Sequence, residues 1–182
     1  MSRGTMLLKE RAGAVDLSVC LLFNRLVHRR YIKPFFAIIS RLGDGVFWYT
    51  LMAVFVLLDG RAGLIAALHM GLVGASGLFV YKLIKKNFVR ERPFITHTVI
   101  QLGARPLDRY SFPSGHTLHA VGFSIIAVAY YPSLAPLLFG FAALVAASRM
   151  VLGLHYPSDV LMGVSIGYLI AQLSWPVVAA LG

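Results

Sequence analysis

Residues 113–149 read PSGHTLHAVGFSIIAVAYYPSLAPLLFGFAALVAASR, a stretch whose only Asp, Glu, Lys or Arg is the arginine at its end. A Pro-Ser pair at 132–133 divides it into two apolar runs, residues 116–131 and 134–150. Each run is close to the length of about 20 residues that a helix needs to cross the hydrocarbon core of a bilayer. We therefore expect two membrane-spanning helices joined by a turn, with both outer ends on the same membrane face.

Three further apolar runs lie on either side of this stretch, at residues 46–58, 62–84 and 159–178. The whole chain is 58% hydrophobic and only 13% charged, whereas a soluble domain carries about 25% charged residues. These charges are too few to coat a soluble protein of 182 residues. The sequence thus predicts an all-α fold, a polytopic membrane helix bundle of about five transmembrane helices that forms a single domain over residues 1–182.

The N-terminal segment differs from these runs. Residues 1–13 are short and polar, and we expect them to be loosely ordered. Residues 14–27 form an apolar helical segment that is interrupted by Asp16, Asn24 and Arg25 and followed by a basic stretch. Such a segment cannot comfortably cross hydrocarbon, so the sequence predicts an N-terminal interfacial helix. We find no secretory signal peptide, and expect insertion to rely on the internal helices.

The chain carries a net charge of +10. A basic balance can serve nucleic acid, an anionic membrane surface or a substrate that bears phosphate. The sequence argues against nucleic acid, because the basic residues are interleaved with the apolar runs and no nucleic-acid-binding motif is present. The single cysteine, Cys20, excludes an intrachain disulfide and a cysteine-based metal site. No obligatory protein partner is evident.

The functional residues are expected in two polar stretches, residues 85–115 and 149–159, which the predicted helices place on one membrane face. In the first stretch, Lys85 and Arg92 are seven residues apart, so a helix would set both cations on one face. Two converging cations suit a phosphate group. The alternative is a basic stretch that holds anionic lipid headgroups without catalysis.

The sequence Pro113-Ser114-Gly115-His116 stands directly before an apolar run. Gly115 lets the backbone approach a ligand closely, and the start of a helix offers free N–H groups to an anion. His116 could donate a proton to a leaving oxygen. The alternative is a helix start capped by serine, with a histidine at the membrane interface.

The second polar stretch contains Arg149, His155 and Asp159. A charged residue at the membrane end of a span is costly unless it is paired or functional, which singles out Arg149. Asp159 follows His155 by four residues and could accept one ring N–H, which leaves the other nitrogen free to attack. The alternative is an acidic residue favoured by the helix dipole beside an unrelated histidine.

Taken together, the clusters resemble the three motifs of the type 2 phosphatidic acid phosphatase (lipid phosphate phosphatase) superfamily. In this sequence the motifs read Lys85-x6-Arg92-Pro93, Pro113-Ser114-Gly115-His116 and Ser148-Arg149-x5-His155-x3-Asp159. The resemblance implies that His155 is the nucleophile that becomes phosphorylated, that Asp159 orients it, and that His116 acts as general acid and then as base. It also implies a phosphate-binding set, which comprises Lys85, Arg92, Ser114, Gly115 and Arg149.

The resemblance further implies an integral membrane enzyme, a metal-independent phosphoric monoester or diphosphate hydrolase that acts on lipids. Its substrate would be a lipid phosphate or diphosphate of the undecaprenyl diphosphate, phosphatidylglycerophosphate or phosphatidic acid class. We expect no metal and no cofactor, because beside Asp159 the polar stretches offer only Glu91 and Asp108 as carboxylates, too few for a two-metal centre. The expected partners are the substrate and the membrane lipids.

Other functions stay open on the sequence. A phosphotransferase would use the same phosphohistidine and pass the group to a second lipid or sugar rather than to water. A non-catalytic membrane protein would use its basic loops only to bind anionic lipid, and it would not need the two histidines. The vanadate-dependent haloperoxidases share this phosphate-site pattern, but they are soluble, and the apolar runs argue against them.

The resemblance to bacterial members implies a multi-pass protein of the inner (plasma) membrane with its active site at the periplasmic face. The positive-inside rule favours the opposite orientation, because nearly all Lys and Arg except Arg61 fall on or near the active-site face. Several of these cations would be retained for substrate binding, which confounds the rule. We therefore keep the periplasmic face as the expectation.

Overall fold

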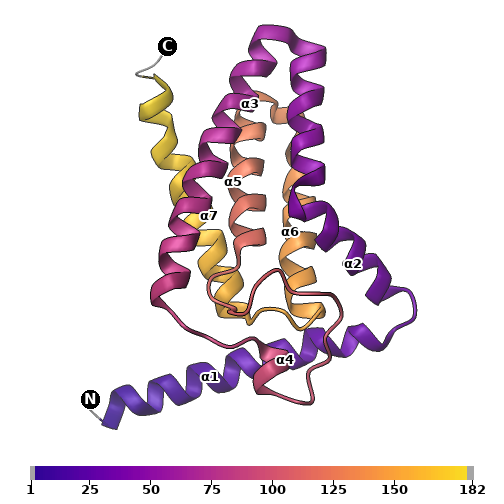
Figure 1. Ribbon diagram of the computed structural model, residues 1–182, viewed down its shortest axis with the longest axis vertical. Helices are drawn as coiled ribbons and strands as arrows, with labels where there is room; N and C mark the ends of the chain where they lie inside the picture. Colours follow the sequence, from indigo (N-terminus) through magenta and orange to yellow (C-terminus); the bar gives the residue numbers. More distant parts are fainter. Residues whose placement is uncertain (1–2, 180–182) are drawn as a thin grey trace.

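The computed structural model describes residues 3–179, and over these residues the chain consists of helices and connecting loops (Figure 1). The all-α helix bundle expected from the sequence is confirmed. The elements follow in the order α1 (Arg3–Asn24), η1 (Arg25–His28), α2 (Ile32–Arg41), η2 (Leu42–Val46), α3 (Phe47–Asn87), α4 (Pro93–Thr96), α5 (Gly115–Tyr130), η3 (Pro132–Leu134), α6 (Ala135–Val151) and α7 (Pro157–Ala179).

The α3 helix turns back on itself at Gly60, whose φ of 51° lies in the left-handed region that favours glycine. The break separates residues 47–59 from residues 61–87, and the two arms run in opposite directions (Figure 1). These arms correspond to the predicted apolar runs 46–58 and 62–84.

The first arm of α3 is extended by α2, which leads into it without a reversal. The connection η2 is a wide helical turn with Gly45 at a φ of 131°, and it bends the chain between α2 and α3. By length and composition, the segments Ile32–Asn87 and Pro132–Val151 are apolar enough to cross a membrane, and Gly115–Tyr130 is a shorter apolar helix. The expected number of spans stays a prediction.

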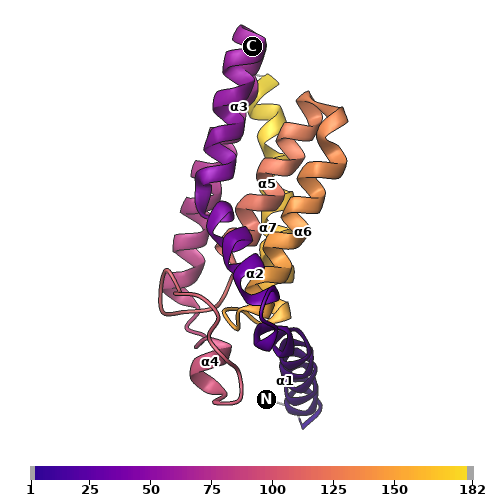
Figure 2. The ribbon, with the colours of Figure 1, turned by 90° about the vertical axis from the view of Figure 1, so that its right-hand side faces the viewer.

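The α5 helix lies at the centre of the bundle, where it packs against α3, α6 and α7 (Figure 2). Glycine lets α7 approach α5 closely, since a Cβ at Gly167 would lie 2.4 Å from the carbonyl oxygen of Leu118. The interior between α3, α5 and α6 is filled by large apolar side chains, among them Trp48, Met70, Phe123, Ile126, Leu138, Phe141 and Val145.

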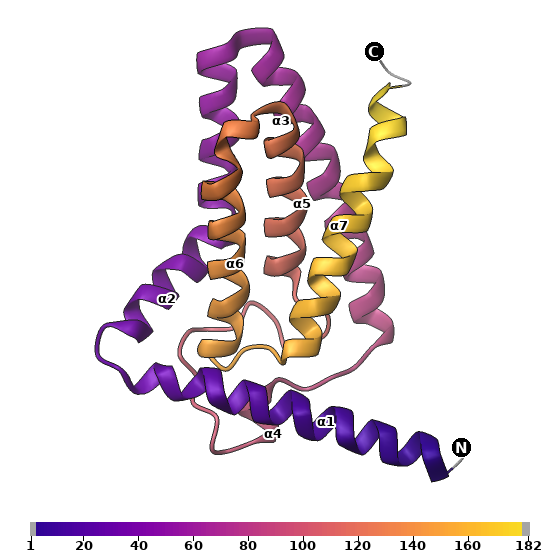
Figure 3. The ribbon, with the colours of Figure 1, turned by 180° about the vertical axis from the view of Figure 1, so that it is seen from behind.

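The α1 helix lies across one end of the bundle rather than alongside its helices, as Figures 1 and 3 show from opposite sides. The loops 88–114 and 152–156 gather at the same end. This is the placement expected of an interfacial helix. The helix begins at Arg3, so residues 3–13, which we expected to be loose, belong to α1. Residues 1–2 of that expectation lie outside the described part of the chain.

Candidate active site

The two polar stretches meet at the end of the bundle that α1 crosses. Arg92 Nη1 donates a hydrogen bond to the carbonyl oxygen of Leu154 at 2.8 Å and lies 3.2 Å from His155 Nε2. Gly103 N donates to the carbonyl oxygen of Leu152 at 3.0 Å. The segments that contain the first and third motifs therefore form one site, as the topology of the sequence predicted.

The three predicted cations lie near one another at this site, but their arrangement differs from the prediction. The α3 helix ends before Arg92, so Lys85 and Arg92 do not share a helix face. Asp108 joins them instead: it forms an ion pair with Lys85, and Arg92 Nη2 donates to its Oδ1 at 2.7 Å. Arg149 is buried and donates to Ser40, while its Nε has no hydrogen-bond partner among residues 3–179.

Asp108 is held between the cations as an anion. Burial by itself would raise the pKa of this carboxyl, but hydrogen bonds from Lys85, Tyr81 and Arg92 lower it to about 2. In the sequence, Asp108 stands out only as one of too few carboxylates for a two-metal centre, and its contact with the cations was not predicted. No local pattern links residue 108 to residue 85, so the pairing becomes visible only in the folded chain.

His155 lies in the loop between α6 and α7, with 2% of its surface exposed. Burial, and then the nearby Arg149 and Arg92, lower its pKa well below the usual value of about 6.5, so the imidazole is neutral. Its Nε2 faces Arg92, whereas its Nδ1 has no hydrogen-bond partner in the described part of the chain. A neutral imidazole beside fixed cations is suited to attack a phosphoryl group.

The predicted hydrogen bond from His155 to Asp159 is not formed. His155 Nδ1 lies 3.7 Å from Asp159 Oδ2, which is beyond hydrogen-bond distance. Both carboxylate oxygens have other donors: Tyr156 N donates to Oδ2 at 2.8 Å, and Arg90 Nη1 donates to Oδ1 at 2.7 Å. Asp159 therefore faces the imidazole, but the backbone and Arg90 hold it.

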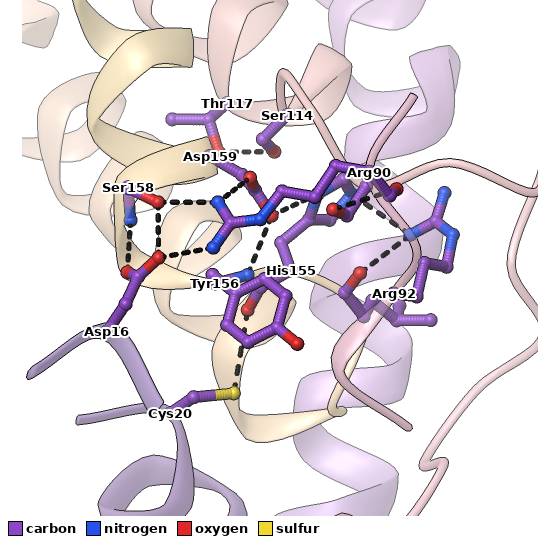
Figure 4. Close-up of polar contacts among 12 residues, drawn as sticks. Asp16, Cys20, Arg90, Arg92, Ser114, Thr117, His155, Tyr156, Ser158 and Asp159 are labelled. Atoms are coloured by element: carbon purple, nitrogen blue, oxygen red, sulfur yellow. Dashed lines mark hydrogen bonds and ion pairs between the residues drawn. The ribbon is translucent and has the colours of Figure 1, made fainter. Parts of the chain in front are cut away.

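Arg90 is the centre of a polar network that was not predicted from the sequence (Figure 4). Besides Asp159, it donates to Ser158 Oγ at 2.7 Å and, through Nη2, to Asp16 Oδ2 of α1 at 2.6 Å. Its guanidinium lies over the ring of Tyr156, 4.0 Å from the centroid. One signal was present in the sequence, because Asp16 is a carboxylate inside an otherwise apolar helical segment.

His116 is the second residue of α5, and its Nε2 is hydrogen-bonded to Asp44 of η2. Nothing in the local sequence of Asp44, which stands between two glycines, indicates a place in the site. A carboxylate on one ring nitrogen fixes the orientation of the imidazole. His116 thus has the fixed carboxylate contact that was expected for His155.

Ser114 and Gly115 lie at the start of α5. The Ser114 hydroxyl is 2.9 Å from Thr117 Oγ1, and Ser114 N donates to the carbonyl oxygen of Asp159 at 3.0 Å. A Cβ at Gly115 would lie 2.8 Å from the ring of Tyr81, so glycine is required for the fit between α5 and α3. These contacts fix the helix start against the site.

Two cavities meet at His116, Asp44 and Leu107. One is mainly apolar, has a volume of about 490 Å³ and is bordered by both arms of α3. Its lining includes Trp48, Met52, Gly71, Gly74 and Leu78. The other is mainly polar and has a volume of about 400 Å³. Its lining includes Ser40, Arg41, Arg105 and Arg149. His116 therefore stands between a cationic space and an apolar one.

Comparison with known proteins places these features in a family. The sequence model of the PAP2 superfamily matches residues 65–182 of the chain. Undecaprenyl-diphosphatase BcrC of Bacillus subtilis is 36% identical over 111 residues, which cover 59% of this chain and 57% of that protein. The lipid A 1-phosphatase of Rhizobium johnstonii is 26% identical over 172 residues, which cover 83% of this chain and 70% of that protein. The chain thus aligns with only a little over half of the length of BcrC.

A solved structure shares the fold. The crystal structure of the first transmembrane PAP2 type phosphatidylglycerolphosphate phosphatase from Bacillus subtilis matches with a TM-score of 0.75 at 24% identity, and the match covers 94% of this chain and 88% of that one. At this identity the likeness establishes the membrane helix bundle and no more. The family match extends over more than half of the chain and includes the motifs that meet in the site, so the chain belongs to the PAP2 superfamily.

Proposed function

We propose that this protein is a multi-pass membrane phosphatase that hydrolyses a lipid phosphate or diphosphate through a phosphohistidine at His155. The observation that carries the proposal is the setting of this imidazole, which is buried, with Nε2 3.2 Å from Arg92 Nη1 and Nδ1 3.7 Å from Asp159 Oδ2. Arg149 and Lys85 add further positive charge around it. A phosphoryl group bound by these cations would present its phosphorus atom to Nε2.

In the first half-reaction, His155 Nε2 forms a bond to phosphorus while the bond from phosphorus to the leaving oxygen breaks. His116 donates a proton to that oxygen, which departs as an alcohol or a phosphate. Asp159, now 3.7 Å from Nδ1, moves closer and stabilises the positive charge that the imidazole gains.

In the proposed reaction, the phosphate-binding residues offset the negative charge on the phosphoryl oxygens. Lys85, Arg92 and Arg149 act as cations, and the backbone N–H of Gly115 adds a donor at the helix start that Ser114 fixes. In the second half-reaction, His116 takes a proton from water, whose oxygen attacks phosphorus as the N–P bond breaks. These steps use only groups of the protein and one water molecule, so the proposed reaction requires no metal ion or cofactor.

The two cavities support a lipid-borne substrate. A leaving group that begins at His116 can extend a hydrocarbon chain into the apolar cavity and an anionic headgroup into the polar one. Arg41 and Arg105 line the polar cavity. We therefore infer a preference for a substrate with a second anionic group, such as undecaprenyl diphosphate or phosphatidylglycerophosphate, over phosphatidic acid.

The proposal is tested by phosphate release from these three lipids with purified protein in detergent, with a chelator present. We expect release to be unaffected by the chelator and label from the substrate to be trapped on His155. Activity that the chelator abolishes would contradict the metal-free reaction, and full activity of His155→Ala would exclude this nucleophile. Label that appears in a second lipid would identify a phosphotransferase.

The substrate chain can be tested separately at a glycine. A Cβ at Gly71 or at Gly140 would meet nothing within 4 Å, but only Gly71 lines the apolar cavity. We expect Gly71→Leu to raise KM for a long-chain substrate about tenfold and Gly140→Leu to leave it unchanged. Equal effects of the two variants on KM would show that the hydrocarbon chain of the substrate does not bind in this cavity.

We place the protein in a bacterial plasma membrane with the site at the periplasmic face. A cysteine that reports the membrane face of the site by labelling must be exposed. Leu107 meets this requirement, since it is 70% exposed and borders both cavities, whereas Ser111 in the same loop is fully buried. A Leu107→Cys variant in intact cells should be blocked rapidly by a membrane-impermeant maleimide, and the buried Cys20 should not react. Labelling only after permeabilisation would put the site on the cytoplasmic face.

A further inference from the structure

The network around Arg90 joins three separate parts of the chain at the start of α7 (Figure 4). Asp16 of α1 accepts a hydrogen bond from Ser158 N at 2.8 Å and another from Ser158 Oγ at 2.5 Å. The same carboxylate accepts from Arg90, which also donates to Asp159. Asp16 therefore caps the α7 helix and fixes Arg90 at the same time.

The inward face of α1 carries Asp16, Cys20 and Asn24, which are buried and spaced four residues apart. Asn24 Nδ2 donates to the carbonyl oxygens of Gln101 and Val151, each at 2.9 Å. Gln101 N in turn donates to Asn24 Oδ1 at 2.8 Å. These polar contacts tie α1 to the loop 88–114, to the end of α6 and to the start of α7, which a helix that only rests on a membrane surface does not require.

Two carboxylates share one guanidinium in this interior. Asp159 is 0% and Asp16 only 8% exposed, and Arg90 forms an ion pair with each. A buried carboxylate without a cation tends to take up a proton, and a second carboxylate nearby strengthens that tendency. Without Arg90, Asp159 would take up a proton more readily than it does now.

Arg90 is also the cation that the fold places on Asp159. Among the described residues, the charges of Cys20, Lys85 and Tyr156 also interact with Asp159, the Ser111 hydroxyl lies near it, and His155 lies beside it. Asp16 shares the guanidinium of Arg90 with it. Of these, burial raises the pKa of the Cys20 thiol to about 12 and raises the pKa of the Tyr156 hydroxyl, so both stay neutral. Lys85 is ion-paired with Asp108 instead.

We propose that Arg90 is a positioning residue which, anchored by Asp16 of α1, keeps Asp159 ionised and directed at Nδ1 of His155. An ionised Asp159 stabilises the imidazolium that forms when Nε2 bonds to phosphorus, whereas a protonated one does not. This inference rests on the proposed phosphohistidine reaction. It extends the catalytic apparatus to a residue outside the motif positions and to the helix across the end of the bundle.

The test compares Arg90→Gln, Asp16→Asn and the double variant, with kcat and KM measured from pH 5 to 9 on dioctanoyl phosphatidic acid. We expect Arg90→Gln to lower kcat about 100-fold with little change in KM, and to move the acid limb of the kcat profile to higher pH. Asp16→Asn should lower kcat less and move the acid limb to lower pH, because Arg90 then serves Asp159 alone.

The double variant gives the decisive result. Removing both charges relieves the repulsion between the carboxylates, so kcat should recover about tenfold relative to Arg90→Gln. If the two residues served folding alone, the losses in kcat of the two single variants would add in the double variant, and the acid limb of the kcat profile would not move. This result would overturn the proposal. Should Arg90→Gln fail to fold, the proposal is tested by Asp16→Asn alone, whose acid limb should move to lower pH. If that limb does not move, the proposal is overturned as well.

Two controls separate this inference from the proposed function. Arg109→Gln removes an arginine that is 72% exposed and paired with Glu91, and it should leave kcat and the profile unchanged. Arg90→Lys keeps the positive charge, so its acid limb should stay near that of the unaltered protein even though kcat falls. If the unaltered protein releases no phosphate, the proposed function fails; if it does and the limbs do not move, only the role of Arg90 fails.

Discussion

His69 and His155 are equally buried, each with 2% of its surface exposed, but their surroundings differ. His69 lies in the second arm of α3, with Nε2 2.7 Å from Ser174 Oγ and Nδ1 3.1 Å from the Tyr130 hydroxyl. His155 has one nitrogen without a hydrogen-bond partner in the described chain and the other facing a guanidinium. Burial therefore does not distinguish the two residues, whereas unmet hydrogen-bonding capacity beside fixed charge singles out His155 as the proposed nucleophile.

The largest expected effect is that of His155→Gln. Because the variant lacks the proposed nucleophile, kcat for phosphate release should fall by at least about 10⁴-fold. Its thermal unfolding temperature in detergent should stay near that of the unaltered protein, since Nδ1 has no partner to lose. Both quantities can be measured on one preparation. A His155→Gln variant that loses stability but keeps most of its kcat would show that His155, like His69, serves the fold rather than the reaction.

His69→Ala should show the opposite behaviour. It removes the partner of both Ser174 and Tyr130 inside the bundle, so the free energy of unfolding should fall by about 1–3 kcal/mol. We expect kcat, measured at a temperature where the variant is folded, to change by less than about threefold. A drop in kcat of the size expected for His155→Gln, without loss of stability, would give His69 a catalytic role.

Asp108→Asn changes the charge around His155 without changing the imidazole. The carboxylate accepts from Lys85 and Arg92, the groups that a phosphoryl ligand would use. Freed of this competitor, the cations should bind inorganic phosphate about tenfold more tightly, which a lower inhibition constant would show. The pKa of Asp108 is about 2, so its carboxylate stays ionised between pH 5 and 9, and any pH dependence of the inhibition constant in this range comes from other groups, including phosphate itself. Glu91→Gln, which alters an exposed pair with Arg109, serves as the matched control.

The smallest expected effect concerns stability at acid pH. The pKa of folded His155 lies well below the value of about 6.5 that it has when unfolded. Below that pH the unfolded chain binds a proton that the folded chain does not, so His155 destabilises the fold as pH falls. Relative to the unaltered protein, His155→Gln should gain about 1 kcal/mol, or about 2–4 °C, between pH 7.5 and pH 5.8. An unchanged difference would mean that folded His155 titrates normally.

Much of this arrangement follows from local features of the sequence. The apolar runs set the helices because hydropathy is read within one segment, and the order of polar stretches and spans then brought residues 85–115 and 149–159 together. The three motifs are likewise short. By contrast, the continuity of α2 with α3 depends on how η2 bends, and a Gly-Asp-Gly stretch reads equally well as a reversal.

The partners of the predicted residues could not be found in this way. Arg90 and Asp16 are 74 positions apart, and His116 and Asp44 are 72 apart. Each pair is formed by the packing of whole helices, and no periodicity records it. The expected contact between His155 and Asp159 failed for a related reason, because the spacing of four residues does not reveal that Arg90 and Tyr156 N already occupy the carboxylate.

The apolar cavity beside α3 reaches the flank of the bundle, where its lining residues Tyr49 and Leu78 are 69% and 44% exposed. Drawing a lipid chain out of a bilayer into water costs about 0.8 kcal/mol for each CH₂ group. For a long prenyl or acyl chain, this transfer would cost far more free energy than binding to an enzyme could offset. If the protein acts on a lipid phosphate as proposed, a slot that opens sideways would let the chain slide in from the surrounding hydrocarbon, so that two-dimensional diffusion within the leaflet would deliver the substrate and carry the product away.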